Sequence, residues 1–375
     1  MLVLNDIKAV LDLITGATFL GTGGGGQPED GIKSLISEIN SHKIIELLGV
    51  EDIPDNAWTA CPFLMGSIAP TTEEKKKEMD WFGLGAPKYA QKEMMAEAIK
   101  ELEHYTGIKI DIIIPIELGG ANTAAAIAAA SLLGKKSVNG DYTGRAIPEI
   151  PQTTPYLNGK KLWPISSVDS YGNICIIVDA LNYLIAERIG KYLSAATFGL
   201  AAQCGFLMKG EEAKKIIVRN TISECIQIGQ IIREAKERGE DVPQKLSETL
   251  NCWVLFKGEV ISRETEDRDG YYWGVNTLRG INEFQSHEFK IWFKNENHIT
   301  WFNGKTYVTS PDIIAIIDID NCEPVTNTKV RVGQKIAVLG LKARGQFCSD
   351  KGLEILGPKH FGFDFNYVPI ENLVK

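Results

Sequence analysis

The chain has 375 residues, enough for about two domains that each bury a core. Hydrophobic residues make up 44% and charged residues 23%, the balance of an ordinary globular protein. The formal net charge of −8 argues against a broad surface that neutralises phosphates, so we expect no nucleic-acid partner.

The N-terminal stretch "LVLNDIKAVLDLITG" places charged residues among its apolar ones and has neither a basic segment nor a cleavage site, so we expect no signal peptide. No run of eighteen apolar residues occurs, and we expect no membrane partner. The seven cysteines are scattered, with no CxxC pair. This usage indicates reduced thiols and a cytoplasmic location.

A first helix, capped by Asn5 or Asp6, leads into the loop "GTGGGG", residues 21–26. The loop contains the G-x-G-x-x-G spacing of a dinucleotide-binding turn. That motif requires a strand before the glycines, whereas here the preceding residues have helical periodicity. A nucleotide-linked enzyme is therefore only a weak third hypothesis, which failure to bind NAD or ATP would remove.

Five glycines exceed what a tight helix–loop–helix connection needs, although such a connection remains the structural alternative. We favour a loop in which the amides of Gly23, Gly24 and Gly25 approach a small polar or anionic ligand. Pro28 then opens a second helix. Strands are predicted at residues 43–50 and 58–68, and helices at 71–79 and 90–107.

A β-α-β unit follows. The apolar strand "KIDIIIPIE" ends in the loop "ELGGANT", which leads into an alanine-rich helix and the short strand "KKSVNGD". Open α/β sheets bind ligands at such strand ends. Glu117, Gly119, Gly120 and Asn122 are therefore candidate ligand-binding residues, and a solvated strand–helix connector is an equally weighted alternative.

The next segment, "NGDYTGRAIPE", spaces Asp141, Arg145 and Glu149 four residues apart. A surface ion pair is the structural alternative. In a functional interpretation Arg145 binds an anionic group, while Asp141 or Glu149 handles a proton. Thr143 lies in the same segment, and Asp169 in "SVDSYGN" is a further candidate, although a turn aspartate is its more ordinary role.

Two helical stretches are predicted around residues 179–203 and 210–238. From about Cys252 the sequence alternates with period two between Asp-Gly and Asn-Gly turns, which predicts a small β-barrel. The predicted fold class is α/β plus all-β, a three-layer α/β domain with a mainly parallel sheet followed by a β-barrel-like domain. We place the domains at residues 1–250 and 251–375, leaving open whether some of residues 150–180 pack with the β domain.

Five isolated histidines without HxH or HExxH spacing predict no metal centre or cofactor, although the carboxylates leave a bound divalent metal open. The sequence also leaves a homo-oligomer open.

With these segments in view, the chain resembles the S-methyl-thiohydantoin desulfurase-like family, long described only as a domain associated with hydantoinase and oxoprolinase genes. The resemblance rests on "LGTGGGGQP", "PIELGGANT", "NGDYTGRAIPE", "SVDSYGN", "KNEN", "SPDIIAIID", "VRVGQKIAVLGL" and "LGPKHFGFDFNYVPI", in this order along nearly the whole chain. It implies a three-layer α/β domain followed by a β-barrel-like domain. The sequence departs from the family pattern at Asn139, Thr143 and Ala121.

The resemblance implies a hydrolase that acts on a small hydantoin-type or S-methyl-thiohydantoin ring, releasing methanethiol or modifying the ring. For such chemistry we expect Asp141 or Glu149 to be the base and Arg145 to stabilise charge. The amides near Gly23–Gly25 would form an oxyanion-like site. The alternative hypothesis is a non-catalytic protein that binds a small metabolite, or a partner of a hydantoinase-like enzyme.

Overall fold

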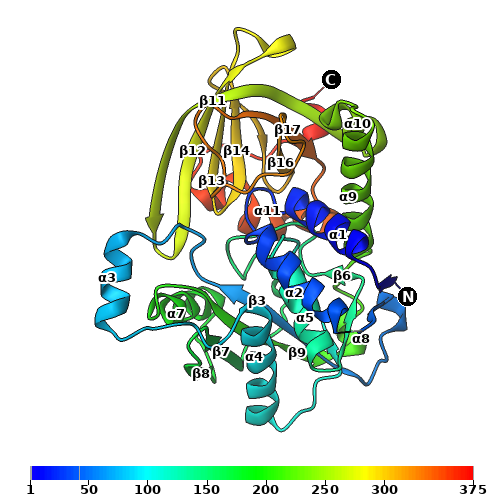
Figure 1. Ribbon diagram of the computed structural model, residues 1–375, viewed down its shortest axis with the longest axis vertical. Helices are drawn as coiled ribbons and strands as arrows, with labels where there is room; N and C mark the ends of the chain where they lie inside the picture. The colour runs from blue at the N-terminus through cyan, green and yellow to red at the C-terminus, as the bar shows by residue number, and fades with distance from the viewer. Residues whose placement is uncertain (1, 42, 375) are drawn as a thin grey trace.

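The computed structural model describes residues 2–41 and 43–374. Figure 1 shows a lower half built on a mixed sheet and an upper half built on a curled antiparallel sheet. Its helices are α1 Ile7–Leu20, α2 Pro28–Asn40, α3 Glu73–Trp81, α4 Gln91–Thr106, α5 Asn122–Leu132, α6 Thr154–Leu157, α7 Tyr183–Ala195, α8 Gly210–Ala213, α9 Thr221–Glu237, α10 Val242–Thr249 and α11 Asp350–Leu356.

The lower sheet has eight strands in the order β1-β2-β5-β4-β3-β9-β7-β8. They are β1 Leu2–Leu4, β2 Ile45–Leu48, β3 Trp58–Met65, β4 Ile112–Ile113, β5 Lys136–Val138, β7 Ile165–Asp169, β8 Ile174–Ile177 and β9 Ala201–Lys209. The pairings β2–β5, β5–β4 and β4–β3 are parallel, and the outer pairings are antiparallel. Parallel pairing is thus concentrated around the β-α-β unit that the sequence indicated. A separate two-stranded ladder joins β6 Gly140–Asp141 to β10 Val218–Arg219.

Apolar clusters cover both faces of this sheet and make three layers. One cluster joins α4 and α5 to the sheet, and another joins its opposite face to α7 and α8. The upper sheet is entirely antiparallel, in the order β15-β14-β13-β12-β11-β17-β16, and forms a half-barrel. Its strands are β11 Cys252–Arg268, β12 Tyr271–Gly280, β13 Glu288–Lys294, β14 Glu296–Phe302, β15 Lys305–Thr309, β16 Ile313–Asp318 and β17 Lys335–Leu341. The expected combination of an α/β fold with a barrel-like β fold is confirmed.

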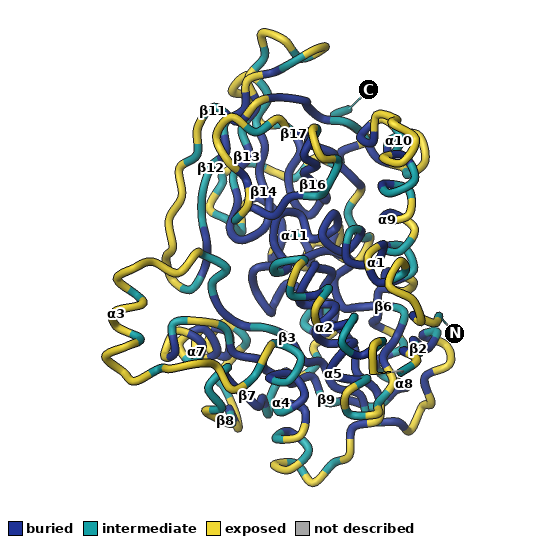
Figure 2. The backbone as a smooth tube through the Cα atoms, in the orientation of Figure 1, coloured by how far each residue is buried: buried dark blue, intermediate teal, exposed yellow. Residues whose placement is uncertain are grey.

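The two halves share a core. One cluster of buried residues includes α1, α5 and α9 together with Ile313, Ala315 and Leu339 of the upper sheet. Figure 2 shows dark, buried stretches of the tube in both halves and in the region between them. The contact between the halves is therefore a continuous apolar layer, and it fixes the site described below.

Local signals in the sequence explain several boundaries. Asp6 accepts a hydrogen bond from the Ala9 amide and is the N-cap of α1, one of the two residues expected there, and Thr72 caps α3 by accepting one from the Lys75 amide. Gly107 ends α4 in the left-handed conformation, with φ of 68°. The helix that was expected before the glycine loop is α1, so the strand required by a dinucleotide-binding turn does not directly precede the glycines.

The prediction of a helix over residues 179–203 is wrong at its C-terminal end. The helix α7 stops at Ala195, and Ala201–Lys209 forms β9 in the middle of the lower sheet. This strand contains no β-branched residue, so its propensity does not reveal it; pairing with β3 and β7 and nearly complete burial override the local signal. The predicted helix at 210–238 likewise divides into α8, β10 and α9.

Candidate active site

A pocket lies where the glycine loop, the carboxyl end of the central strands, α7 and the β13–β14 turn converge. It offers a volume of about 70 Å³, enough for several water molecules or a small ligand group. Four acidic side chains and one lysine are the ionisable groups in its lining: Glu117, Glu149, Glu187, Glu296 and Lys191. The pocket therefore combines segments as far apart in the sequence as Gly25 and Glu296, which are 271 residues apart.

Glu117 follows β4 and lines the pocket. The Asn122 amide group donates to its Oε1 at 2.7 Å, and the Ile147 backbone amide donates to its Oε2 at 2.8 Å. Burial raises the pKa of Glu117 to about 7, although both hydrogen bonds act in the opposite direction. Glu117 can therefore change its protonation state at neutral pH, as a general acid or base must.

Glu296, at the start of β14, brings a second carboxyl group to the same pocket. The Gly25 amide donates to its Oε1 at 3.3 Å, whereas its Oε2 has no hydrogen-bond partner among the described residues. Burial and the nearby Glu117 raise the pKa of Glu296 well above its ordinary value. These surroundings thus favour the neutral form of the Glu296 carboxyl group.

The glycine loop presses directly against this carboxyl group. A Cβ atom at Gly24 would lie 1.7 Å from Glu296 Oε1, so only glycine allows this approach. Gly25 and Gly26 line the pocket, but the Gly25 amide is used on Glu296 and the Gly24 amide on the Gly21 carbonyl. Gly23 lies outside the lining, and its carbonyl accepts a hydrogen bond from the backbone amide of Asn327. The carboxyl group that the loop contacts in this structure belongs to the protein itself.

Glu149 also lines the pocket, but it has charged partners. Lys294 forms an ion pair with its Oε1, and His360 Nε2 lies 2.9 Å from its Oε2. Although burial raises the pKa of Glu149, the His360 hydrogen bond and the Lys294 charge outweigh that effect and lower it to about 2. Glu149 is therefore an ionised link between the two halves and a weak base.

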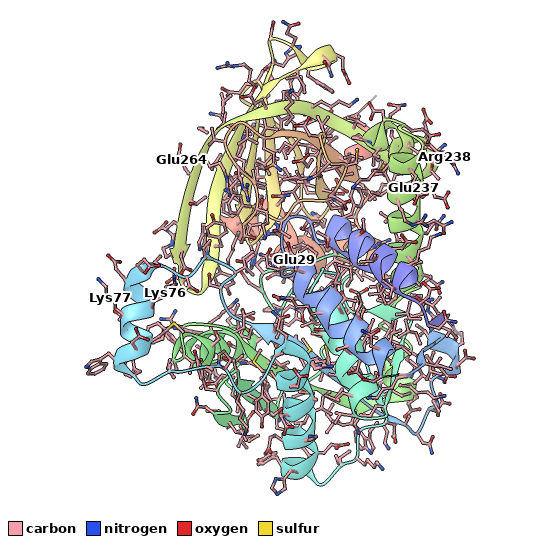
Figure 3. The ribbon with its side chains drawn as sticks, viewed as in Figure 1. Glu29, Lys76, Lys77, Glu237, Arg238 and Glu264 are labelled. Atoms are coloured by element: carbon pink, nitrogen blue, oxygen red, sulfur yellow. The ribbon has the colours of Figure 1, made fainter. Side chains whose placement is uncertain are left out.

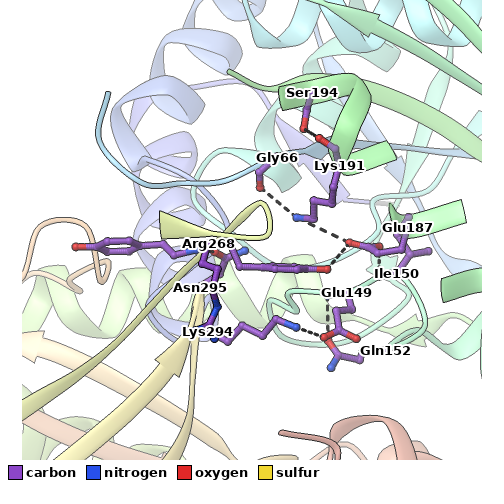
Figure 4. Close-up of polar contacts among 12 residues, drawn as sticks. Gly66, Glu149, Ile150, Gln152, Glu187, Lys191, Ser194, Arg268, Lys294 and Asn295 are labelled. Carbon is purple, nitrogen blue, oxygen red and sulfur yellow. Dashed lines mark hydrogen bonds and ion pairs between the residues drawn. The ribbon is translucent and has the colours of Figure 1, made fainter. Parts of the chain in front are cut away.

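Glu187 and Lys191 reach the pocket from the inner face of α7 (Figure 4). The Ile150 amide and the Tyr271 hydroxyl donate to Glu187 at 2.9 Å and 3.0 Å. Lys191 Nζ donates to the Gly66 carbonyl at 3.2 Å and lies 3.8 Å from Glu187. The Tyr271 ring lies between two ammonium groups, 4.1 Å from that of Lys191 and 3.9 Å from that of Lys294. Burial raises the pKa of Glu187 and lowers the pKa of Lys191, although each group moves the other in the opposite direction.

Arg145 is buried and lies outside the pocket lining. Its guanidinium donates to the carbonyls of Ala146, Pro311, Asp312 and Asn297 and to the Thr22 hydroxyl, at 2.9–3.2 Å. These five bonds match its five N–H donors. Arg145 thus ties the glycine loop to the upper sheet, and these contacts give no support to the expected binding of an anion.

Asp141, the last residue of β6, and Thr143, in the turn that follows, are buried outside the pocket lining. Asp141 Oδ2 accepts hydrogen bonds from the Thr143 and Gly144 amides and from the Thr143 hydroxyl, at 2.7–2.9 Å. Burial raises the pKa of Asp141 to about 6. Asp141 contributes to the pocket indirectly, since its charge raises the pKa of Glu117.

The remaining expected residues separate into two places. Gly119 and Gly120 lie beneath the glycine loop, and a Cβ at Gly119 would come within 2.4 Å of the Gly25 Cα. Asp169 closes the β7–β8 turn, where it accepts hydrogen bonds from the Tyr171 and Asn173 amides. It lines a different groove, at the edge of the lower sheet. The structure therefore brings Glu117, Asn122, Glu149 and Gly25 together at the pocket, but not Asp169.

The sequence patterns did not identify Glu187, Lys191 or Glu296 as site residues. Glu296 lies in "KNEN", one of the stretches on which the family resemblance rests. It is the first residue of β14, and an acidic residue at the start of a strand is the signal that could have identified it. Glu187 and Lys191 are four residues apart on α7, a spacing that equally suits a surface ion pair. Over residues 2–41 and 43–374, no group of three or more His, Cys, Asp or Glu side chains is placed to hold a metal ion.

No helix in the described part of the chain is both long and apolar enough to span a membrane. A crystal structure of a protein from Chromobacterium violaceum shares the fold, with a TM-score of 0.77 and 17% identity over 99% of this chain and 100% of that one. No curated protein matches the sequence.

Two family models together account for nearly the whole chain. The model described as the S-Me-THD-like N-terminal domain matches residues 8–179, and the one described as the S-Me-THD-like C-terminal domain matches residues 181–370. The resemblance that began with the glycine loop and the strand-end segments thus extends across both halves of the fold. This chain belongs to the S-Me-THD-like family.

Proposed function

We propose that this protein is a hydrolase of a small hydantoin-type ring and that it converts an S-methyl-thiohydantoin into the hydantoin and methanethiol. The observation that carries the proposal is the pair of buried carboxyl groups, Glu117 and Glu296, in one small pocket. Membership of the S-Me-THD-like family agrees with a thiohydantoin-type substrate.

The pair has the properties of an acid and a base working together. The pKa of Glu117 is raised to about 7, and the pKa of Glu296 lies well above its ordinary value. Near neutral pH Glu117 is therefore able to accept a proton, and we assign the proton-donating role to Glu296, whose neutral form the surroundings favour. Two titratable groups whose environments separate their pKa values are the usual basis for assigning acid and base roles.

The reaction balances with these two residues alone. Glu117 takes a proton from water as the oxygen attacks the ring carbon that bears sulfur, and this proton then passes to the ring nitrogen. The C–S bond breaks with its electron pair on sulfur, and Glu296 protonates the methylthiolate. The proton of the new hydroxyl returns to Glu296 as the carbonyl forms. One water is consumed, and both carboxyl groups regain their starting states.

The other groups position this pair. Asn122 and the Ile147 amide orient Glu117, and the Gly25 amide orients Glu296. Lys191, in the pocket wall, provides positive potential for the nitrogen on which charge develops. Glu149 remains paired with Lys294 and His360 and keeps the halves in register.

The proposal is tested by incubating the purified protein with S-methyl-thiohydantoin or plain hydantoin, each with added divalent metal or with a chelator. Headspace gas chromatography measures methanethiol, and liquid chromatography measures ring products. We expect methanethiol from the first compound, in equal amounts under both conditions. Calorimetric binding of the ring without turnover would overturn the hydrolase proposal in favour of a metabolite-binding protein.

A further inference from the structure

The outer face of α7 carries an apolar stripe that nothing in the described structure covers. Leu184, Ile185, Ile189 and Tyr192 are 36–61% exposed, and Leu181, just before the helix, is 85% exposed. Their spacing places them on one side of the helix. A helix on the surface of a globular protein normally turns its apolar stripe towards a core. This stripe therefore indicates a partner.

Beside α7 the strand β8 forms an edge of the lower sheet and pairs only with β7 in the described part of the chain (Figure 1). The Asp169 amide donates to the Asn173 carbonyl, and hydrogen-bonded pairs alternate along an antiparallel ladder. The backbone groups of Ile174 and Ile176 consequently face the open edge. The strand reads "ICII", without the lysine, proline or bulge that usually protects an edge from pairing.

A third group of apolar side chains lies at the end of α3, which stands away from the body of the molecule with Lys76 and Lys77 on it (Figure 3). All nine residues of α3 are described, and none is buried. Trp81 and the following Phe82 are 80% and 61% exposed. A groove lined by Phe82, the β8 residue Cys175 and Ala196 beyond α7 connects the three groups.

We infer that this surface, which we call the α7–β8 edge, is the interface of a homodimer, with β8 pairing antiparallel to β8 of a second copy about a twofold axis. An antiparallel pair of identical strands satisfies the rule that a twofold interface uses the same patch on both copies. The open edge of β8 can form backbone hydrogen bonds with another β-strand, and β8 of a second copy is such a strand. Within the stripe of α7, all of whose residues are described, Arg188 is the only charged side chain, so this part of the surface brings few charges together.

The amount of apolar surface fits a stable dimer. The large apolar side chains of the edge are Trp81, Phe82, Ile174, Val178, Leu181, Leu184, Ile185, Ile189 and Tyr192. Their exposed fractions run from 36% to 85%. With roughly 200 Å² of surface for each large side chain, these residues together expose on the order of 1,000 Å². Each partner in an interface of standard size buries about 800 Å². A patch of this size is larger than monomers ordinarily leave exposed.

The interface would also support the pocket. The helix α7 has the apolar stripe on one face and Glu187 and Lys191, which line the pocket, on the other. A second copy packed against the stripe would hold this wall in place from behind. The proposal goes beyond the hydrolase function and does not depend on it, since oligomeric state is measured without any substrate.

The test is light scattering coupled to size exclusion on the full chain at micromolar concentration. We expect twice the chain mass of 41.3 kDa for the natural protein and a single chain mass for Leu184→Asp. Ile176→Pro removes a free-edge amide but no bond to β7, so it should also give monomers, with a melting temperature near that of the monomeric Leu184→Asp variant. Val332→Asp changes a residue that is 63% exposed outside this edge and is expected to remain dimeric.

A natural protein that is monomeric at these concentrations would overturn the proposal, including one that binds phospholipid vesicles through the same face. A dimer that resists both substitutions at the edge would show that the copies meet elsewhere. Circular dichroism of each variant identifies any that fails to fold. If Leu184→Asp unfolds, Ile176→Pro and the smaller change Tyr192→Ser decide the question.

Discussion

The pocket has two walls whose carboxyl groups are in opposite electrostatic states. On one wall, Glu117 and Glu296 are buried with neutral hydrogen-bond donors, and their pKa values rise. On the other, Glu149 is equally buried but meets Lys294 and His360, and its pKa falls to about 2. Glu117, Glu296 and Glu149 are similarly buried, so for these three groups the hydrogen-bonding and charged partners decide in which direction the pKa moves.

Among the substitutions at these carboxyl groups, Glu117→Gln should have the largest effect on activity. Glutamine keeps the shape of the side chain but cannot accept the proton of water, so we expect kcat to fall about 10³-fold, within the range for loss of a general base. Methanethiol release under saturating substrate measures the effect. Glu38→Gln is the matched control, because Glu38 is equally buried but lies outside the pocket, paired with Lys43 and Lys92. A Glu117→Gln enzyme with full activity would refute the assignment.

Glu149→Gln should act on stability instead. It leaves the Lys294 ammonium buried without its ion-pair partner, which costs about 3 kcal/mol of unfolding free energy. Because the folded-state pKa is depressed, the contribution of Glu149 is present above its ordinary pKa of about 4.5 and is lost as the pH falls towards 2. Urea denaturation at pH 7 and pH 3 therefore should show a smaller difference at pH 3. An equal difference at both values would contradict the ionised state of Glu149.

Glu296→Gln should have an intermediate effect on the reaction and a small one on folding. Glutamine resembles the protonated carboxyl group and still accepts the Gly25 hydrogen bond, but its amide is a very weak acid. We expect kcat to fall about 10²-fold with little change in melting temperature. A substrate with a better thiolate leaving group than methanethiol should recover part of the loss. The absence of any recovery would argue against protonation of the leaving group.

The smallest expected effect is the dependence of activity on pH, which tests the raised pKa of Glu117. If the pKa of Glu117 is about 7 and its ionised form is the base, activity should rise about tenfold between pH 6 and pH 8. The measurement is kcat/KM against pH, which reports groups of the free enzyme. Asp141→Asn provides a control with a stated direction, because it removes a charge that raises the Glu117 pKa and so should move the midpoint to lower pH. A midpoint that does not move would mean that another group controls the profile.

Much of the fold follows from local sequence signals, and the site follows only in part. Asp6, Thr72 and Gly107 define helix ends by short-range capping, which a single sequence reveals. The strand β9 depends on neighbours contributed by β3 and β7, so its own residues do not indicate it. The division of the chain at residue 250 remains a prediction.

The same distinction applies to the site residues. Glu117 was identified because a strand end is a local feature. Arg145 has the same sequence appearance whether its guanidinium faces a ligand or, as here, carbonyl groups from the other half of the molecule. Glu296 becomes significant only when the glycine loop, over 270 residues away, presses against it. Sequence patterns find residues of suitable chemistry, while long-range packing decides their partners.

The close approach of Gly25 and Gly119 has a consequence for how this region can vary. A side chain added at either position meets the backbone of the other at 2.4 Å, so a first alanine must push the two loops apart. Once they have separated, a second alanine meets much less obstruction, and the two substitutions should cost less together than their separate effects predict. The two positions therefore vary unequally: a change at Gly25 makes a later change at Gly119 easier, whereas Gly25 keeps its preference for glycine because its φ is +73°.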